Sequence, residues 1–228
     1  MNDTYVQVAK VRKVPRKFTS TEITRRSILR ATLKLIGKGG PDAVTHRAVA
    51  GRAKIPLGSV AYHFQSRDRL IIEAFRALMN ATELHLASVA QEKQLTNRGV
   101  TPQDLINGAA LMLEQEFTHP EFVRAEYELI LYTAHSPELK REFLAYQRSI
   151  QTGFAYLLEL LGAPRPFDAA RTVMGMVRAF ELERLVEPTA KIEEFMRRLD
   201  PIVRALIEPA HLSEPSSSTS STGKKVTH

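Results

Sequence analysis

The 228-residue sequence contains no cysteine. Disulfides, thiolate metal sites and cysteine-based catalysis are therefore excluded, and the composition fits a reducing compartment. No apolar run approaches the roughly 18–20 residues that a membrane helix needs. The N-terminal stretch 1–17 lacks the apolar centre of a secretion signal. We therefore expect a cytoplasmic protein without a membrane-spanning segment.

Common catalytic motifs are also missing. The sequence has no P-loop, no dinucleotide-binding glycine pattern and no serine or cysteine nucleophile motif. A metal site at Glu114, Glu116 and His119 is an alternative suggested by their spacing. However, Pro120 should break a helix there, and no second His–carboxylate pair completes the site. We expect no enzyme activity, no metal and no cofactor, with a helical enzyme as the opposing alternative.

Positive charge is concentrated in the first third of the chain. Residues 1–69 hold 15 Lys and Arg against 4 Asp and Glu, a net charge of +11, whereas residues 70–228 hold 17 against 21, a net of −4. This asymmetry indicates that one region meets a polyanion and the rest does something else. A merely solubilising basic face is the alternative.

The apolar spacing predicts helices throughout and no period-2 strand. A basic arm (1–19) precedes a first helix of about 16 residues, which should end at the glycines of 37–40. Two short helices follow, the first capped by Thr45 and the second running over about 57–65. Further helices are expected near 67–92, 102–118, 120–134, 137–162, 167–186 and 189–208.

The predicted fold class is therefore all-α: an N-terminal three-helix helix-turn-helix DNA-binding module followed by a larger six-helix domain for ligand binding and dimerisation. The expected boundaries are a disordered arm at 1–19, a DNA-binding domain at 20–66, a helical domain at 67–210 and a disordered Ser-rich tail at 211–228.

The helix around the sequence SVAYHFQSRDRL (59–70) has two faces. With ~100° per residue, Val60 and Phe64 lie on one face and Ser59, Tyr62 and His63 on another. The apolar face can fix the helix in a small core. The polar face suits a DNA groove, because hydroxyl and imidazole groups bond to phosphates and base edges. A further set lies at helix N-termini, where it favours phosphate or close backbone approach: Thr45, His46, Arg47 and Gly58.

These residues carry a resemblance to the TetR family of bacterial repressors. It runs from Ile28 through Leu35-Ile36 and then through VTHRAVAGRAKIPLGSVAYHFQSRDRLI (44–71). It implies a DNA-reading module on a larger helical domain that binds a small molecule and dimerises through its last two helices. By position it places recognition-helix contacts on Leu57, Gly58, Ser59, Tyr62 and His63, and phosphate contacts on Thr45, Arg47 and Arg67.

Two departures from the family pattern stand out. Lys54 occupies the turn position where glycine is most common, so either a side chain adopts the left-handed conformation there or the turn conformation is adjusted. Pro56 and Leu57 stand where polar base-reading residues are common. Specificity is therefore expected to rest on methyl contacts, DNA shape and the arm, with Lys13, Arg16 or Lys17 as its groove or phosphate contacts.

Aromatic and polar side chains gather in residues 116–147. Ordinary packing in the core of a helix bundle explains such a run. The more specific alternative is an apolar cavity lined by a few polar groups that bind a small molecule. Arg178 and Glu181 could add polar groups from a later helix. The candidate ligand-binding residues are Phe117, Arg124, Tyr127, Glu128, Leu131, His135 and Arg178.

The last two predicted helices carry more apolar surface than one small domain obviously needs. We expect them to form a four-helix dimer interface, and completion of the monomer's own core is the alternative. The candidate dimer residues are Val173, Val177, Phe180, Phe195, Leu199, Ile202 and Leu206. A dimer would present two recognition helices about one DNA turn apart to a near-palindromic operator.

The sequence thus predicts a ligand-responsive transcriptional repressor that binds double-stranded operator DNA as a homodimer and is released by a small-molecule effector. The fourth helix (67–92), which links both regions, is expected to transmit the signal. The alternatives are a regulator without an effector and a nonspecific nucleoid-type DNA binder.

Overall fold

The computed structural model describes residues 19–95 and 100–208, and between 82 and 95 it describes the backbone alone. The predicted all-α class is confirmed, since these residues form helices and contain no strand. The predicted tail and nearly all of the arm, including Lys13, Arg16 and Lys17, lie outside the described residues. The helices are α1 (Ser20–Gly39), α2 (His46–Ala53), α3 (Leu57–His63), α4 (Arg67–Leu95), α5 (Pro102–Glu116), α6 (Pro120–Tyr132), α7 (Pro137–Leu160), α8 (Pro166–Val186) and α9 (Ile192–Ile207).

Helix α1 begins with a capping box and is longer than predicted. Thr19 accepts a hydrogen bond from the backbone of Glu22, whose carboxylate in turn accepts one from the backbone of Thr19. The helix continues through Gly37 and ends at Gly40, which has φ of 70°. The helix therefore ends within the glycine-rich stretch 37–40, as predicted, and it is longer than the expected 16 residues because it begins earlier and passes through Gly37. Gly37 serves packing, because a Cβ there would lie 1.8 Å from the carbonyl oxygen of Glu121.

The turn between α2 and α3 has the geometry of a helix-turn-helix. Lys54 ends α2 in the left-handed conformation, with φ of 57°, and is the one described non-glycine residue with positive φ. The conformation anticipated at this departure from glycine is therefore present. The backbone N–H of Ile55 donates to the carbonyl oxygen of Ala50, and Pro56 precedes the first turn of α3. The bend is thus held by backbone bonds despite the strain of a side chain at Lys54.

Two apolar cores follow one another along the molecule. The first joins the DNA-binding helices α1–α3 to α4, α6 and α7, and contains Ile28, Phe64, Phe75, Phe122 and Phe143. The second joins α5, α7, α8 and α9. Helix α7 belongs to both cores and therefore connects the N-terminal module mechanically to the rest of the chain.

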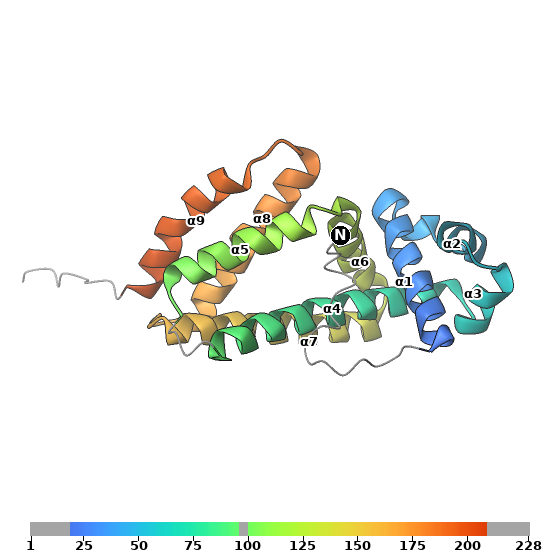
Figure 1. The fold of residues 1–228 in the computed structure, drawn as a ribbon, viewed down its shortest axis with the longest axis horizontal. Helices are drawn as coiled ribbons and strands as arrows, with labels where there is room; N and C mark the ends of the chain where they lie inside the picture. The colour runs from blue at the N-terminus through green and yellow to red at the C-terminus, as the bar shows by residue number, and fades with distance from the viewer. Residues whose placement is uncertain (1–18, 96–99, 209–228) are drawn as a thin grey trace, which may run out of the picture.

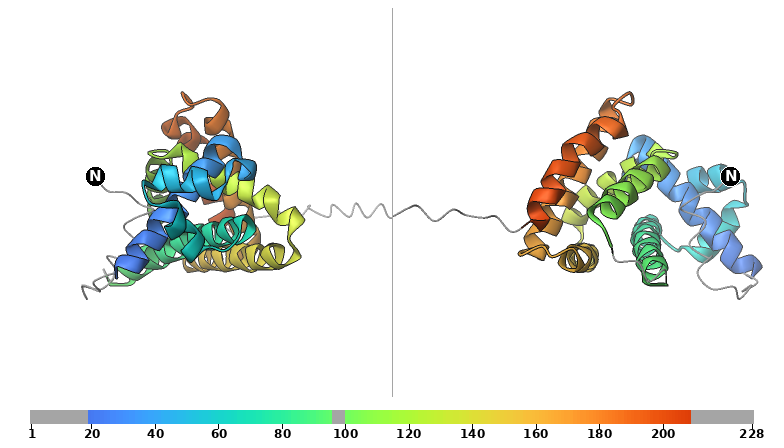
Figure 2. Two further views of the ribbon diagram at one scale, coloured as in Figure 1. Left: turned by 90° about the vertical axis from the view of Figure 1, so that its right-hand side faces the viewer. Right: turned by 60° about the vertical axis from the view of Figure 1, so that its left-hand side comes forward.

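The molecule is elongated, with α1–α3 at one end and α8–α9 toward the other (Figures 1 and 2). Helices α4 and α7 pack along each other beneath α5 and α6. Among the described residues, no helix is long and apolar enough to cross a membrane. This arrangement separates a possible DNA surface from a cavity in the opposite half.

Candidate nucleic-acid interface and ligand cavity

Helix α3 divides its side chains as the sequence predicted. Val60 and Phe64 are buried in the first core, whereas Tyr62 is 81% exposed and its ring makes an edge contact with His63 at 5.3 Å. The outward residues that complete this face are exposed Leu57 and Gly58 and half-buried Ser59. The face offers two hydroxyls and an imidazole beside apolar surface, so it can dock in a groove but has few groups for reading base edges.

Side chains at the start of α2 form internal hydrogen bonds that the sequence did not predict in full. Thr45 accepts a hydrogen bond from the backbone N–H of Ala48, at 3.1 Å, and so caps the helix. Nε2 of His46 lies 2.7 Å from the carbonyl oxygen of Phe64 and, as donor, ties the start of α2 to the end of α3. Arg47 is exposed. Of these three predicted contacts, Arg47 remains the most available to a phosphate.

Arg67 has an internal task. Its Nε donates to the carbonyl oxygen of Val44 at 3.1 Å, and its Nη2 donates to the carbonyl oxygen of Pro41 and to Asp42 Oδ1, both at 2.8 Å. Its Nη1 also lies 3.6 Å from Asp68. The guanidinium thus clamps the segment before α2 onto the start of α4, and its predicted phosphate contact would compete with these bonds.

The DNA-binding module meets the rest of the chain closely at α6. Gly37 of α1 lies against the backbone of Glu121, and Lys34 forms an ion pair with the Glu121 carboxylate at 3.3 Å. Lys34 and Arg30 also lie over the ring of Phe122, at 5.6 and 5.7 Å from its centroid. Because no side chain fits between the two backbones, a shift of α6 must move α1.

An ionic network forms a second connection. Arg25 of α1 bonds to Glu73 of α4 at 2.6 Å, and Arg76 bonds to Glu73 at 2.9 Å. Arg76 also bonds to Glu142 of α7, at 2.5 Å, and this contact lowers the pKa of Glu142. The network joins α1, α4 and α7 in series.

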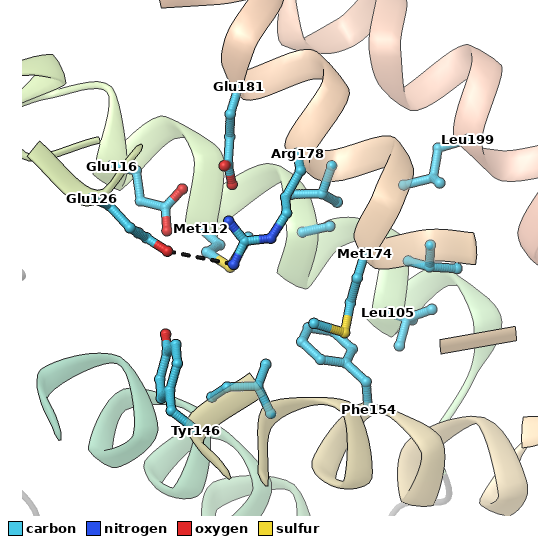
Figure 3. A pocket seen from close by; sticks show the side chains of 14 residues that line it. Leu105, Met112, Glu116, Glu126, Tyr146, Phe154, Met174, Arg178, Glu181 and Leu199 are labelled. Atoms are coloured by element: carbon cyan, nitrogen blue, oxygen red, sulfur yellow. Dashed lines mark hydrogen bonds and ion pairs between the residues drawn. The ribbon is translucent and has the colours of Figure 1, made fainter. Parts of the chain in front are cut away.

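A cavity of about 70 Å³ lies between α5, α6, α7, α8 and α9. Figure 3 shows Phe154, Met174 and Leu105 at one side of it and a group of charged side chains at the other. The volume is smaller than a drug-sized molecule requires, so a ligand must displace side chains, and the flexible methionines can move. The lining residues are Leu105, Ala109, Met112, Glu116, Glu126, Tyr146, Ile150, Phe154, Val173, Met174, Val177, Arg178, Glu181 and Leu199.

Three carboxylates and one guanidinium form the charged end of the cavity. Arg178 Nη2 lies 3.4 Å from Glu126 Oε1. The hydroxyl of Tyr127 donates to Glu181 Oε2 at 2.6 Å and lies 3.2 Å from the carbonyl oxygen of Arg178. Glu116 Oε2 is buried and has no hydrogen-bond partner among the described residues. The side chains of Glu116, Glu126 and Glu181 surround the guanidinium (Figure 3).

The protonation of this end follows from its burial and crowding. Burial, together with the charges of Glu181 and Glu126, holds the pKa of Glu116 well above its usual value. Burial and the charge of Glu126 raise the pKa of Glu181 to about 7, against the opposing hydrogen bond from Tyr127. Burial and Glu181 raise the pKa of the Tyr127 hydroxyl, which stays protonated. The cavity therefore contains carboxyl groups that are readily protonated near neutral pH.

The predicted ligand residues divide into two groups. Arg178 lines the cavity and Tyr127 supports its charged end, as does Glu181. The others do not line it: Arg124 and His135 are exposed, Leu131 is 72% exposed, Glu128 lies near Gly40, and Phe117 lies under Arg184. The aromatic run gave the wrong face of α6, because density of aromatic residues does not distinguish a cavity wall from an outer surface.

The sequence analysis missed Glu126 and assigned Glu116 to a different kind of site. Glu116 ends a helix whose Leu105, Ala109 and Met112 all face the cavity, so a lone carboxylate on that apolar face was the available signal. Among the described residues no group of His, Asp and Glu could hold a metal ion.

Most of the predicted dimer residues lie inside the monomer. Phe180 and Phe195 stack at 4.5 Å, and both are buried. Within one chain α8 and α9 use these apolar faces to cover α5 and α7, which is the alternative that the sequence left open, so the dimer contacts of these residues stay a prediction. The residues in this second core are Val173, Val177, Phe180, Phe195 and Leu199, with Leu206 packed against it; Ile202 stays 37% exposed.

A different face of α8 is open. Its exposed residues recur with alternating spacings of three and four: Thr172, Gly175, Ala179, Leu182 and Val186. Two of these are large and apolar, with Leu182 47% and Val186 87% exposed. Small residues in the middle of such a stripe allow another helix to approach closely.

Comparisons with known proteins agree with this architecture. A family model described as bacterial regulatory proteins of the tetR family matches residues 28–74, and one described as a tetracyclin repressor-like C-terminal domain matches residues 100–209. Over 186 residues, 78% of this chain and 86% of the relative, the sequence is 22% identical to the HTH-type transcriptional regulator PksA of Bacillus subtilis.

Solved structures share the fold. A TetR-family transcriptional regulator from Mesorhizobium loti superposes with a TM-score of 0.69 at 18% identity, over 83% of this chain and 98% of that one. The multidrug binding protein EbrR, in complex with ethidium, gives a TM-score of 0.54 at 26% identity, over 78% of this chain and 97% of that one.

Proposed function

Because the chain belongs to the TetR family of bacterial transcriptional regulators, which bind DNA through a helix-turn-helix and are not enzymes, we propose that it is a dimeric, ligand-responsive repressor. In this proposal α3 docks in the major groove of a near-palindromic operator, and an effector in the cavity releases the protein. Of the predicted DNA contacts, His46 and Arg67 bond within the protein. The proposal therefore rests on the remaining residues, Thr45, Arg47, Leu57, Gly58, Ser59, Tyr62 and His63.

The position of the cavity relative to α1 carries the proposal. Glu126 of α6 lines the cavity, and Glu121 lies little more than one turn earlier on the same helix. Glu121 and Phe122 pack on α1 through Lys34 and the close approach at Gly37. A ligand that displaces Glu126 therefore acts on a rigid element that already touches the DNA-binding module.

This geometry adds α6 to the expected route through α4. The described lining residues come from α5 to α9, so α6 is the described helix that both lines the cavity and packs on α1. The ionic network of Arg25, Glu73 and Arg76 leads to the same module through α4 and α7. A coupling of about 1–3 kcal/mol between the sites would change operator affinity about 5–150-fold.

The open stripe of α8 supports the dimeric part of the proposal. Pairing of two copies through Thr172, Gly175, Ala179, Leu182 and Val186 would cover apolar surface that a lone chain leaves in water. It would place two α3 helices on one side of the assembly, as a two-fold symmetric operator requires.

A selected-site DNA pull-down with purified protein, followed by fluorescence anisotropy on the enriched sequence, tests the proposal. We expect a near-palindromic site that random DNA does not displace at equal concentration. Equal competition by random DNA would favour the nonspecific nucleoid-type binder. Specific binding that no cavity ligand alters would favour the regulator without an effector.

A further inference from the structure

The charged end of the cavity has an excess of negative groups. Its lining includes three carboxylates, Glu116, Glu126 and Glu181, and a single cation, Arg178. Arg178 reaches Glu126 at 3.4 Å, whereas Glu116 Oε2 has no hydrogen-bond partner among the described residues. Burying a carboxyl group without a hydrogen-bond partner is costly whether or not it is protonated, so the site is incomplete as it stands.

Three kinds of occupant can be compared by charge. With all four groups ionised, the charged end of the cavity carries a net charge of −2. A bound anion would make the net charge −3, and a bound monovalent cation would make it −1. A metal ion is disfavoured, because the described carboxylates are not grouped as metal ligands. An organic cation is larger than a metal ion and can reach several carboxylates that do not converge on one point.

The remainder of the cavity selects for an apolar body. Beyond the charged end the lining is aliphatic, aromatic or thioether, with Leu105, Ile150, Phe154, Met174 and Leu199. The methionines adapt to irregular shapes, so the cavity can open from its present volume around an extended or ring-shaped hydrophobic group. The two ends together fit an amphiphile with its charge at one end.

We infer that the cavity binds a monocationic amphiphile whose ammonium or amidinium group lies between Glu116, Glu126 and Glu181 and displaces the guanidinium of Arg178 from Glu126. Arg178 acts in the empty protein as an internal substitute for the ligand's cation. This inference rests on the proposed function only in taking the cavity as the effector site.

Displacement of Arg178 also explains how binding of the ligand's cation changes the contacts of α6. The Glu126–Arg178 contact joins α6 to α8, and the Tyr127 hydroxyl joins the same helices through Glu181. A cation that takes over Glu126 and Glu181 exchanges these contacts for its own. Helix α6 is then free to shift relative to α8.

Protons should leave when the cation binds. The groups facing this end are Glu116 of α5, Glu126 and Tyr127 of α6, Tyr146 of α7, and Arg178 and Glu181 of α8. Burial raises the pKa of both Glu116 and Glu181, and a nearby cation favours their ionised forms. Binding therefore releases protons below about pH 7 and strengthens as the pH rises toward 7.

Isothermal titration calorimetry with three ligands of one chain length tests the inference: decylammonium, decanol and decanoate, all below micellar concentrations. We expect the ammonium compound to bind about tenfold or more tightly than decanol, since a charge-assisted contact contributes ~1.5–3 kcal/mol, and decanoate to bind most weakly. Titrations in two buffers of different ionisation enthalpy should show proton release for the ammonium compound alone. Stronger binding of decanoate, or no proton release, would overturn the inference.

Variants sharpen the test. Glu116→Gln should reduce ammonium affinity about tenfold and leave decanol unchanged, whereas Glu114→Gln, at an exposed position of the same helix, should change neither. Arg178→Met should strengthen ammonium binding, because the competing cation is gone. Weaker ammonium binding in Arg178→Met would contradict the inference. If the ammonium compound binds as expected but operator affinity does not change, the inference stands and the proposed function fails.

Discussion

At the scale of single residues, Tyr62 is the clearest candidate for DNA contact. It is 81% exposed at the end of a helix whose neighbours Val60 and Phe64 are buried. We expect Tyr62→Ala to weaken operator binding by about 1–3 kcal/mol without changing the melting temperature. Fluorescence anisotropy checks this, with Tyr156→Ala, an exposed tyrosine on α7, as control. Unchanged affinity would remove Tyr62 from the interface.

Arg67 offers a choice between two roles. Its Nε and Nη2 bond to three different acceptors in the segment before α2, a geometry that lysine cannot reproduce. We expect Arg67→Lys to lower the thermal stability of the protein and to weaken operator binding through disorder of that segment. Operator affinity and melting temperature of Arg67→Lys equal to those of the wild type would mean that the positive charge of residue 67 matters for phosphate contact and that its bonds to the segment before α2 do not.

Gly37 holds the closest contact between α1 and α6. A methyl group there would overlap the carbonyl of Glu121, at 1.8 Å. Gly37→Ala should therefore destabilise the protein by about 1–3 kcal/mol or more, as overpacking does. Gly108→Ala on α5 is the matched control, because its Cβ would meet open space and helix propensity alone should stabilise it by up to about 1 kcal/mol. Chemical denaturation measures both, and equal stabilities would refute the close packing.

At the scale of helices, the sequence predicted nearly every element. Caps at Thr19, Thr45 and Ser136 and prolines in first turns define helix starts by local chemistry. The packing role of Gly37, within the glycine-rich end of α1, was not predicted. Its role depends on α6, which lies more than eighty residues later in the chain, and local pattern carries no such information.

The same reason explains which site residues were found. The two faces of α3 follow from its own periodicity, so Tyr62 and Val60 were assigned correctly to outside and inside. The cavity forms between five helices, and its lining depends on how they rotate about their axes. Arg178 and Tyr127 were found, whereas Leu131 was placed in the cavity and is 72% exposed. The apolar faces of α8 and α9 likewise predicted burial, but the periodicity of these two helices does not show that α5 and α7 of the same chain cover them.

The exposed stripe of α8 leads to a prediction about assembly. Leu182→Arg puts a charge into the middle of the expected helix pair, so we expect a monomer by light scattering and a large loss of operator affinity. Leu131→Arg changes a leucine on α6 that is more exposed, 72% against 47%, and should remain dimeric. A dimeric Leu182→Arg protein would place the interface elsewhere.

At the scale of the whole molecule, stability should depend on pH through the cavity. Burial raises the pKa of Glu181 from 4.5 to about 7 in the folded chain. The folded state therefore holds more protons than the unfolded one between these values, so its stability is greatest below pH 4.5 from this group and falls as the pH rises toward 7. Urea denaturation across this range should show a shallower decline for Glu181→Gln than for the wild type. Identical slopes would contradict the assigned burial.

The whole molecule also explains why the cavity and the DNA surface can communicate over its length. Helix α6 belongs to the first core through Phe122 and Leu129 and reaches the cavity through Glu126. No hinge loop separates these contacts. Under the proposed function, a change at the charged end would move α6 as a rigid helix and thereby displace α1.

The most direct test of ligand-responsive repression is operator affinity measured by fluorescence anisotropy as decylammonium is titrated into wild-type protein and into Glu116→Gln. We expect the dissociation constant of the wild type to rise about 5–150-fold at saturation, with the midpoint for Glu116→Gln at about tenfold higher ligand concentration. Operator affinity that stays constant while calorimetry shows the cavity to be saturated would contradict the account.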